Sequence, residues 1–127
     1  MIVIDASAAL SGLLNDGAAR VWMTREQLHA PHLIDSEVVS VLRHHVASGR
    51  LPVAEGWGAL AIWRRLGLTR YPSTGLLDRI WQLRENVTPY DAGYVALAES
   101  LRCQLLTADS RLSRAPGIEC PITFVPR

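Results

Sequence analysis

The stretch "IVIDASAALSGLLN", residues 2–15, indicates how the chain folds. Its first three residues are β-branched and apolar, which is typical of a buried strand, and leucines then recur at helical spacing from Leu10 to Leu14. A strand that leads directly into a helix is the first half of a βαβ unit. Between the two lies Asp5, a carboxylate at the end of an apolar strand. Such a group is desolvated on one side, so it caps the helix, holds a cation or takes part in a reaction.

The remaining sequence continues the alternation of strand and helix. The apolar spacing predicts helices over 17–27, 33–48, Pro52 to about Leu66, 75–84 and 86–102, and extended segments at 28–31, 68–72, 103–109 and 122–125. The clearest helix start places Thr88 at the N-cap and Pro89 at the first helical position. Alternation of this kind favours a three-layer α/β/α fold with a central, mainly parallel sheet. At 127 residues we expect one domain over residues 1–127.

The cysteines, the absence of a leader and the hydropathy indicate a cytoplasmic protein. Cys103 and Cys120 lie far apart with no metal-type spacing, so we expect two buried thiols and no disulfide. The N-terminus lacks the basic and apolar regions of a signal peptide. No apolar run approaches the roughly 18 residues of a membrane span.

The charged residues exclude several functions. All 13 basic residues are arginines, and the absence of lysine excludes a Walker-type phosphate loop and Schiff-base chemistry. A net charge of +1 is far from the basic character of a duplex-binding module. His44 and His45 are adjacent on a predicted helix and point apart, so we interpret them as surface or boundary residues and not as zinc ligands.

Four acids lie at the ends of predicted elements. Asp5 and Asp109 each follow a strand, and ligands of open parallel sheets bind beyond these carboxyl ends. Asp91 lies in the first turn of its helix, and Glu37 lies near the start of another, at the border of that helix's apolar stripe. Helix capping or the helix dipole explains each acid taken alone. Together, clustered carboxylates would repel one another unless a cation such as Mg²⁺ lay between them.

Four segments carry a resemblance to a known family: "IVIDASA", "LIDSEVVSVL" with Glu37, "TPYDAGYVALAESL" with Asp91, and "LLTADSRL" with Asp109. Their order resembles the PIN-domain ribonucleases of the VapC toxin type, over nearly the whole chain. The resemblance implies a PIN-like fold and a Mg²⁺- or Mn²⁺-dependent endoribonuclease that hydrolyses RNA with a metal-activated water. It also implies a homodimer and a VapB-type antitoxin that inhibits it.

The same resemblance gives the expected site. Asp5, Asp91 and Asp109 would hold the ion and Glu37 would hold it directly or through water, while the hydroxyls of Ser7 and Thr107 would support the acids or a bound water. Arg111 and Arg114 follow Asp109 and are candidates for RNA phosphate contacts, with a solvated helical turn as the alternative.

Other interpretations remain open from the sequence. The chain is alternatively a non-catalytic PIN-fold module that binds a protein partner, or a housekeeping PIN nuclease for RNA maturation or for DNA. The segment 52–85 carries no motif. Its Trp57 and Trp63 are typical of core or interface positions, and we hypothesise that part of this segment contacts the antitoxin or the second subunit.

Overall fold

A five-stranded, all-parallel sheet forms the centre of the computed structural model, which describes residues 1–127. The strand order is β3-β2-β1-β4-β5. The strands are β1 (Ile2–Ile4), β2 (Leu28–Pro31), β3 (Leu68–Tyr71), β4 (Leu105–Thr107) and β5 (Ile122–Phe124). This arrangement confirms the predicted α/β fold class, and the last strand lies at an edge of the sheet as expected.

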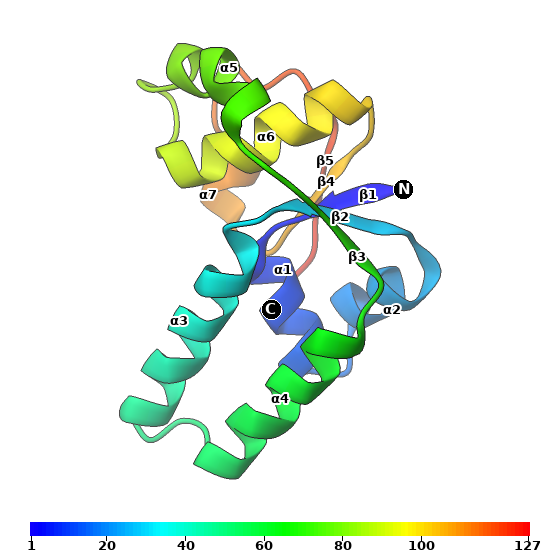
Figure 1. The fold of residues 1–127 in the computed structure, drawn as a ribbon, viewed down its shortest axis with the longest axis vertical. Coiled ribbons are helices and arrows are strands. Elements are labelled where there is room, and N and C mark those ends of the chain that lie inside the picture. The colour runs from blue at the N-terminus through cyan, green and yellow to red at the C-terminus, as the bar shows by residue number, and fades with distance from the viewer.

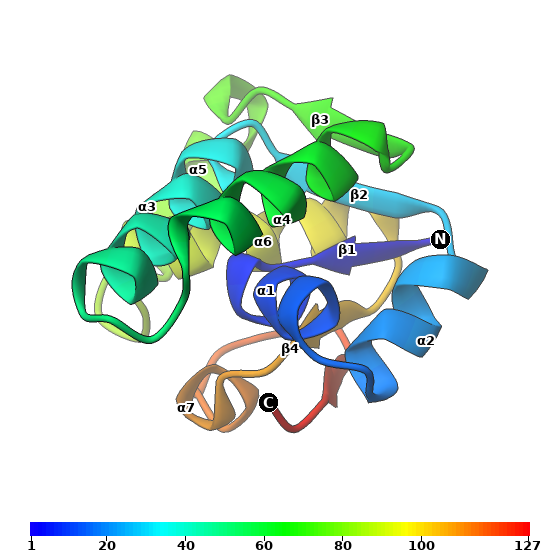
Figure 2. The same cartoon turned by 90° about the horizontal axis from the view of Figure 1, so that it is seen from below.

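Helices cover both faces of the sheet (Figure 1). They are α1 (Ala6–Leu14), α2 (Ala18–Arg25), α3 (Ile34–Ala47), α4 (Val53–Arg65), α5 (Leu77–Gln82), α6 (Pro89–Leu101) and α7 (Ser110–Ser113), with a 3-10 turn (Thr74–Leu76) before α5. The first four helices lie on one side and α5 and α6 on the other, which gives the three layers seen from below in Figure 2.

The core is centred on β1, β4 and α6. All three residues of β1 and all three of β4 are buried, and α6 buries an unbroken run from Ala92 to Ala98. A strand between two others, covered on both faces, carries apolar residues at every position, as β1 does. The helix α6 begins as its sequence predicts, since Thr88 is the N-cap and its hydroxyl accepts a hydrogen bond from the backbone N–H of Asp91.

The strand order changes direction between β1 and β4. From β1 the chain adds β2 and β3 on one side, and it then returns to add β4 and β5 on the other. Helices from the two sides leave a crevice at the carboxyl ends of the strands at such a switch point, and ligands of doubly wound sheets bind there. Asp5 directly follows β1, and Asp109 lies two residues after β4. The topology therefore places the two acids that end strands on the two sides of this crevice.

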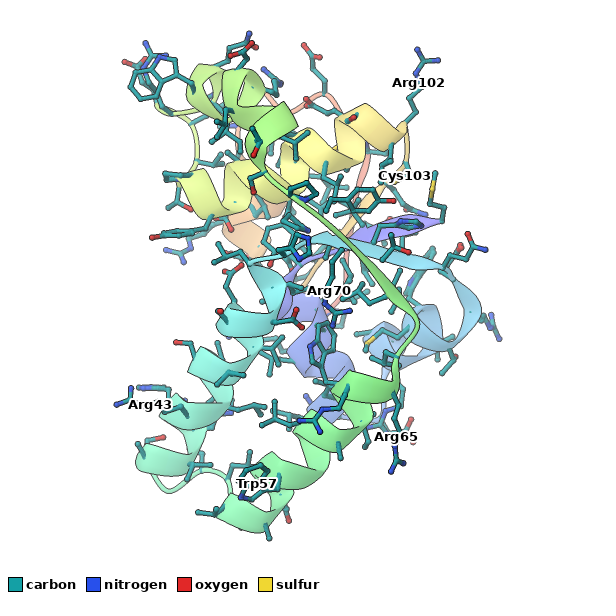
Figure 3. All side chains as sticks on the ribbon, viewed as in Figure 1. Arg43, Trp57, Arg65, Arg70, Arg102 and Cys103 are labelled. Carbon is teal, nitrogen blue, oxygen red and sulfur yellow. The ribbon has the colours of Figure 1, made fainter.

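The hairpin of α3 and α4 extends away from the sheet (Figure 1). It is tied to β3 by Asp35, which accepts hydrogen bonds from Arg70 Nε at 2.6 Å and Arg70 Nη2 at 2.8 Å, and from Trp63 Nε1 at 2.8 Å. Trp63 is 4% exposed and belongs to the core, which is one of the two positions that the sequence left open for it. Trp57 is 69% exposed near the far end of the hairpin (Figure 3).

Both cysteines are free thiols, as predicted, but they are half-buried and not fully enclosed. Cys103 precedes β4 and Cys120 precedes β5, and both line a shallow pocket with Glu99 and Arg102. None of the helices combines the length and the apolar character needed to cross a lipid bilayer.

Candidate active site

One cavity of about 270 Å³ collects the four acids that the sequence singled out. Asp5 follows β1, Glu37 lies in the first turn of α3, Asp91 in the first turn of α6, and Asp109 is the N-cap of α7. All four line this cavity, together with Ser7 and Tyr94. Side chains that are far apart in the sequence therefore meet at the switch point of the sheet.

Asp5 is the most enclosed of the four, at 4% exposed. Its Oδ1 accepts hydrogen bonds from Ser7 Oγ at 2.6 Å and from the backbone N–H of Ala8 at 2.9 Å, and its Oδ2 accepts one from Thr107 Oγ1 at 2.5 Å. Asp5 is thus the N-cap of α1, as the capping interpretation predicts. Burial raises the pKa of Asp5 to about 6, although the hydrogen bonds from Ser7, Thr107 and Ala8 oppose the change. A carboxylate has about four acceptor positions, so Oδ2 keeps one open.

Ser7 and Thr107 connect Asp5 to the segment after β4. Ser7 Oγ accepts a hydrogen bond from the backbone N–H of Ala108 at 2.9 Å, and Thr107 Oγ1 accepts one from that of Asp109 at 3.0 Å. Each hydroxyl therefore donates to Asp5 and accepts from the chain that carries Asp109. The two predicted supporting residues lie beside the acids and fix the position of one acid relative to another.

Glu37 reaches the cavity from the border of α3's buried face, as its helical position predicts. It is half-buried, whereas Ile34, Val38 and Leu42 of the same helix are fully enclosed. Its Oε1 accepts a 2.6 Å hydrogen bond from the hydroxyl of Tyr94. Burial raises the pKa of Glu37; the bond from Tyr94 opposes this rise, and the charge of Asp91 adds to it.

Asp91 and Asp109 line the cavity and also a smaller pocket beside it. Burial raises the pKa of Asp91, and the negative charge of Asp109 raises it further. Asp109 caps α7 by accepting a 2.9 Å hydrogen bond from the backbone N–H of Arg111. The guanidinium Nε of Arg111 is 3.7 Å from the same carboxylate, on a largely solvent-exposed side chain. This weak pair leaves most of the negative charge of the cavity without a counter-charge from the protein.

The acids share a cavity but do not form a closed ligand set. No three His, Cys, Asp or Glu side chains approach closely enough to make a ready metal cluster. The sequence argument expected the carboxylates to meet at one point, and the structure instead places them around a shared space. Mg²⁺ usually keeps several waters and binds through one or two carboxylates. The arrangement fits that mode of binding. Burial, with a smaller part from neighbouring carboxylates, raises the pKa values of Asp5, Glu37 and Asp91, and a bound cation would favour their charged forms.

Several residues of the cavity were missed or given other roles in the sequence analysis. Tyr94 lies one helical turn after Asp91, and this spacing was the available signal for its place in the site. His45 also lines the cavity whereas its neighbour His44 is exposed, so the two histidines do point apart. Arg111 lies at the edge of the site, beside a smaller pocket that includes Asp91 and Asp109. Arg114 is exposed and lines neither of these cavities.

Comparison with known proteins agrees with this geometry. The family model described as "PIN domain" matches residues 2–118. Ribonuclease VapC9 of Mycobacterium tuberculosis is 58% identical over 127 residues, which is 100% of both chains. The crystal structure of PAE2754 from Pyrobaculum aerophilum superimposes with a TM-score of 0.70 at 25% identity, covering 95% of this chain and 81% of that one.

The fold is also found in a solved structure from Rickettsia felis. The structure titled VapBC2 from Rickettsia felis, bound to a DNA fragment from its promoter, gives a TM-score of 0.68 at 12% identity and covers 98% of this chain and 99% of that one. At this identity the likeness concerns the fold alone. The full-length match to VapC9 and the matching family model show that the chain belongs to the PIN-domain family, among the VapC ribonucleases.

Proposed function

We propose that the chain is the toxin of a toxin–antitoxin pair and an endoribonuclease that hydrolyses RNA phosphodiester bonds with the help of a divalent cation. The observation that carries this proposal is the meeting of Asp5, Glu37, Asp91 and Asp109 in one cavity at the switch point of the sheet. The full-length relatives named as VapC ribonucleases support the reaction class.

The donor set fits a hard divalent cation. Its oxygens belong to carboxylates, which Mg²⁺ and Mn²⁺ prefer, and there is no cysteine among the lining residues. Asp5, Asp91 and Asp109 would hold the ion, and Glu37 would hold it directly or through a water. When bound, Mg²⁺ would lower the pKa of a water and stabilise the leaving oxygen of the phosphodiester.

The protein residues then have separate roles. Ser7 and Thr107 hold both oxygens of Asp5 and so orient its free acceptor position toward the cavity. Tyr94 favours the ionised form of Glu37 and opposes the rise in its pKa, because a donated hydrogen bond stabilises the charged carboxylate. Arg111, at the rim, is placed to contact an RNA phosphate. Arg114 has the weaker case for a phosphate contact, because it lies outside the pocket.

The direct test is cleavage of a single-stranded RNA by the purified protein. Magnesium-dependent cleavage that stops on chelation and is abolished by Asp5→Asn would support the proposal. Asp35→Asn is the matched control, since Asp35 is an acid of α3 that binds Arg70 and Trp63 outside the cavity. Absence of cleavage by the wild-type protein would favour a binding module. Equal cleavage of DNA and RNA would favour a nuclease of broader function.

We further propose a VapB-type antitoxin and a second copy of the chain as partners. Trp57 and Ile62 leave large apolar surfaces of α4 exposed, which is typical of a protein interface. The expected result is that Trp57→Ala weakens antitoxin binding or dimer formation. Trp81→Ala is the matched control, because Trp81 is similarly exposed but lies on α5, on the other side of the sheet. Unchanged antitoxin affinity and oligomeric state in the Trp57 variant would contradict this role.

A further inference from the structure

The cavity does not end at the acids. It continues between α1 and α3, which pack together, along residues that have no part in the charge cluster. On α3, Glu37 is followed in the lining by Val41 and His45, at successive intervals of four residues. Residues with this spacing lie one above another on the same helix face. Helices α1 and α3 both begin at the carboxyl edge of the sheet and run away from it (Figure 1).

The chemical character of the cavity changes along this path. Beyond Glu37 no Asp or Glu side chain lines the walls. Leu14 and Val41 provide half-buried apolar surface, and the side chains of Asn15, His45 and Arg127 provide polar and basic groups. The four carboxylates lie together around the start of α1, α3, α6 and α7. One cavity therefore has an anionic end, an apolar middle and a neutral-to-basic end.

The size of the cavity limits its occupant. A helix rises about 1.5 Å per residue, so His45 lies about 12 Å along α3 from Glu37. The volume of about 270 Å³ belongs to the whole cavity, the acid end included, and lies just below the range of pockets that enclose a drug-sized molecule. A duplex does not fit into such a space, whereas a single unstacked base does.

We infer that this extension is a subsite for one unstacked nucleoside adjacent to the scissile phosphate of single-stranded RNA, an inference that rests on the function proposed above. Leu14 and Val41 cover the faces of the base, and Asn15 and His45 contact its polar edge. The basic side chain of Arg127 faces the next phosphate. Sequence-specific RNA-binding proteins read single-stranded bases in this way, between apolar or aromatic surfaces and hydrogen-bonding side chains.

The charge distribution favours this occupant. RNA places a phosphate on each side of every nucleoside, so an occupant of the extension has one phosphate near the acids and one near Arg127. The acid end accepts a phosphate only with a divalent cation present, while no Asp or Glu side chain lines the far end.

The matched pair for the test is His45→Ala and His44→Ala, two neighbours on α3 of which one lines the cavity and the other is exposed. Each variant and the wild type would be assayed on a set of single-stranded RNAs that carry every base at each position near the cleavage site. Asn15→Ala serves as an independent second variant. Binding of a fluorescently labelled single-stranded RNA would be measured separately with each substitution placed in the Asp5→Asn background, where hydrolysis is blocked.

The expected result is that His45→Ala and Asn15→Ala raise KM and weaken RNA binding about fivefold to a hundredfold, the range for loss of one base contact, and relax the preference at a single nucleotide position. His44→Ala should match the wild type in all three readouts. If the wild type cleaves RNA and His45→Ala and Asn15→Ala, both folded, resemble His44→Ala, the subsite is wrong while the proposed function stands. If the wild type fails to cleave, the proposed function itself is wrong.

Discussion

The hydroxyl of Tyr94 donates a 2.6 Å hydrogen bond to Oε1 of Glu37, although 57 residues separate the two in the sequence. Tyr94 is almost fully buried on α6, and Glu37 lies at the edge of α3. Burial and the negative charges around it raise the pKa of Tyr94, so the hydroxyl keeps its proton and remains a donor at every physiological pH. The bond therefore joins two helices and favours the charged form of one acid of the cavity.

Tyr94→Phe should lower activity by about tenfold near neutral pH, the value of one hydrogen bond to a charged group. Without this bond the pKa of Glu37 rises further, because the remaining influences of burial and Asp91 both favour the neutral acid. The loss should thus be larger at pH 6 than at pH 8. The measurement is the pH dependence of kcat/KM, with the melting temperature as a check on folding. A profile that keeps its wild-type shape would show that Tyr94 has no such role.

Asp5→Asn should stabilise the protein at neutral pH in the absence of divalent cations. The folded state raises the pKa of Asp5 to about 6, so it binds this proton more tightly than the unfolded chain does. The contribution of Asp5 to stability is then complete below about pH 4 and is lost as the pH rises to 6. A pKa that differs by about 2 between the folded and the unfolded state corresponds to about 3 kcal/mol of stability. The asparagine accepts fewer hydrogen bonds than the carboxylate, and the cost of this loss must be subtracted.

Thermal unfolding with chelator, from pH 4 to 8, measures this effect. The melting temperature of Asp5→Asn should exceed that of the wild type by several degrees at pH 7, at about 3–5 °C per kcal/mol, and the gap should close near pH 4. Added Mg²⁺ should raise the melting temperature of the wild type more than that of the variant. A variant less stable than the wild type at pH 7 would mean that burial of the charged carboxylate of Asp5 does not destabilise the fold.

Ser7→Ala should reduce both stability and activity. The substitution leaves the backbone N–H of Ala108 without its acceptor and removes one donor from Asp5 Oδ1. A buried donor left unpaired costs about 1–3 kcal/mol. Loss of the bond to Asp5 also raises the pKa of that carboxyl further, which should move the acid limb of activity upward. Ser40→Ala, at an exposed position of α3, is the control and should change neither property.

The two thiols should react slowly at neutral pH. Burial and the neighbouring carboxylate of Glu99 raise the pKa of Cys120 to about 11, and burial raises the pKa of Cys103. Only the thiolate is nucleophilic. Alkylation of Cys120 by iodoacetamide at pH 7.5 should be roughly a hundredfold slower in the folded protein than in urea, and should accelerate about tenfold per pH unit. Equal rates in the folded and unfolded protein would contradict these pKa shifts.

The order of the elements was predictable from the sequence because each carries a local physical signal. Thr88 and Pro89 mark the start of α6. The three apolar residues at 2–4 predict a strand that is covered on both faces. Helical spacing also placed Glu37 at the edge of α3. These signals act over one or two turns, and the parallel sheet then brings Asp5 and Asp109 to the same edge as a consequence of topology.

The contacts between distant side chains were not predictable in the same way. Helical spacing gives the direction of a residue but not the partner that it meets, so the bond of Tyr94 to Glu37 and the entry of His45 into the cavity were missed. Trp63 is buried and its indole N–H donates to Asp35, whereas the sequence left both a core and an interface position open for it. The spread of the acids around the cavity depends on rotamers and on the width of the crevice.

The central claim is that the carboxylates of this cavity bind a divalent cation. The most direct measurement is a calorimetric titration of Mn²⁺ into the purified wild-type protein and into Asp5→Asn, Asp91→Asn and Asp35→Asn. The account predicts saturable binding by the wild type and by Asp35→Asn, and binding weakened at least about tenfold in the other two variants, since each of these loses a charged ligand. Equal Mn²⁺ affinity in all four proteins, or no saturable binding by the wild type, would contradict it.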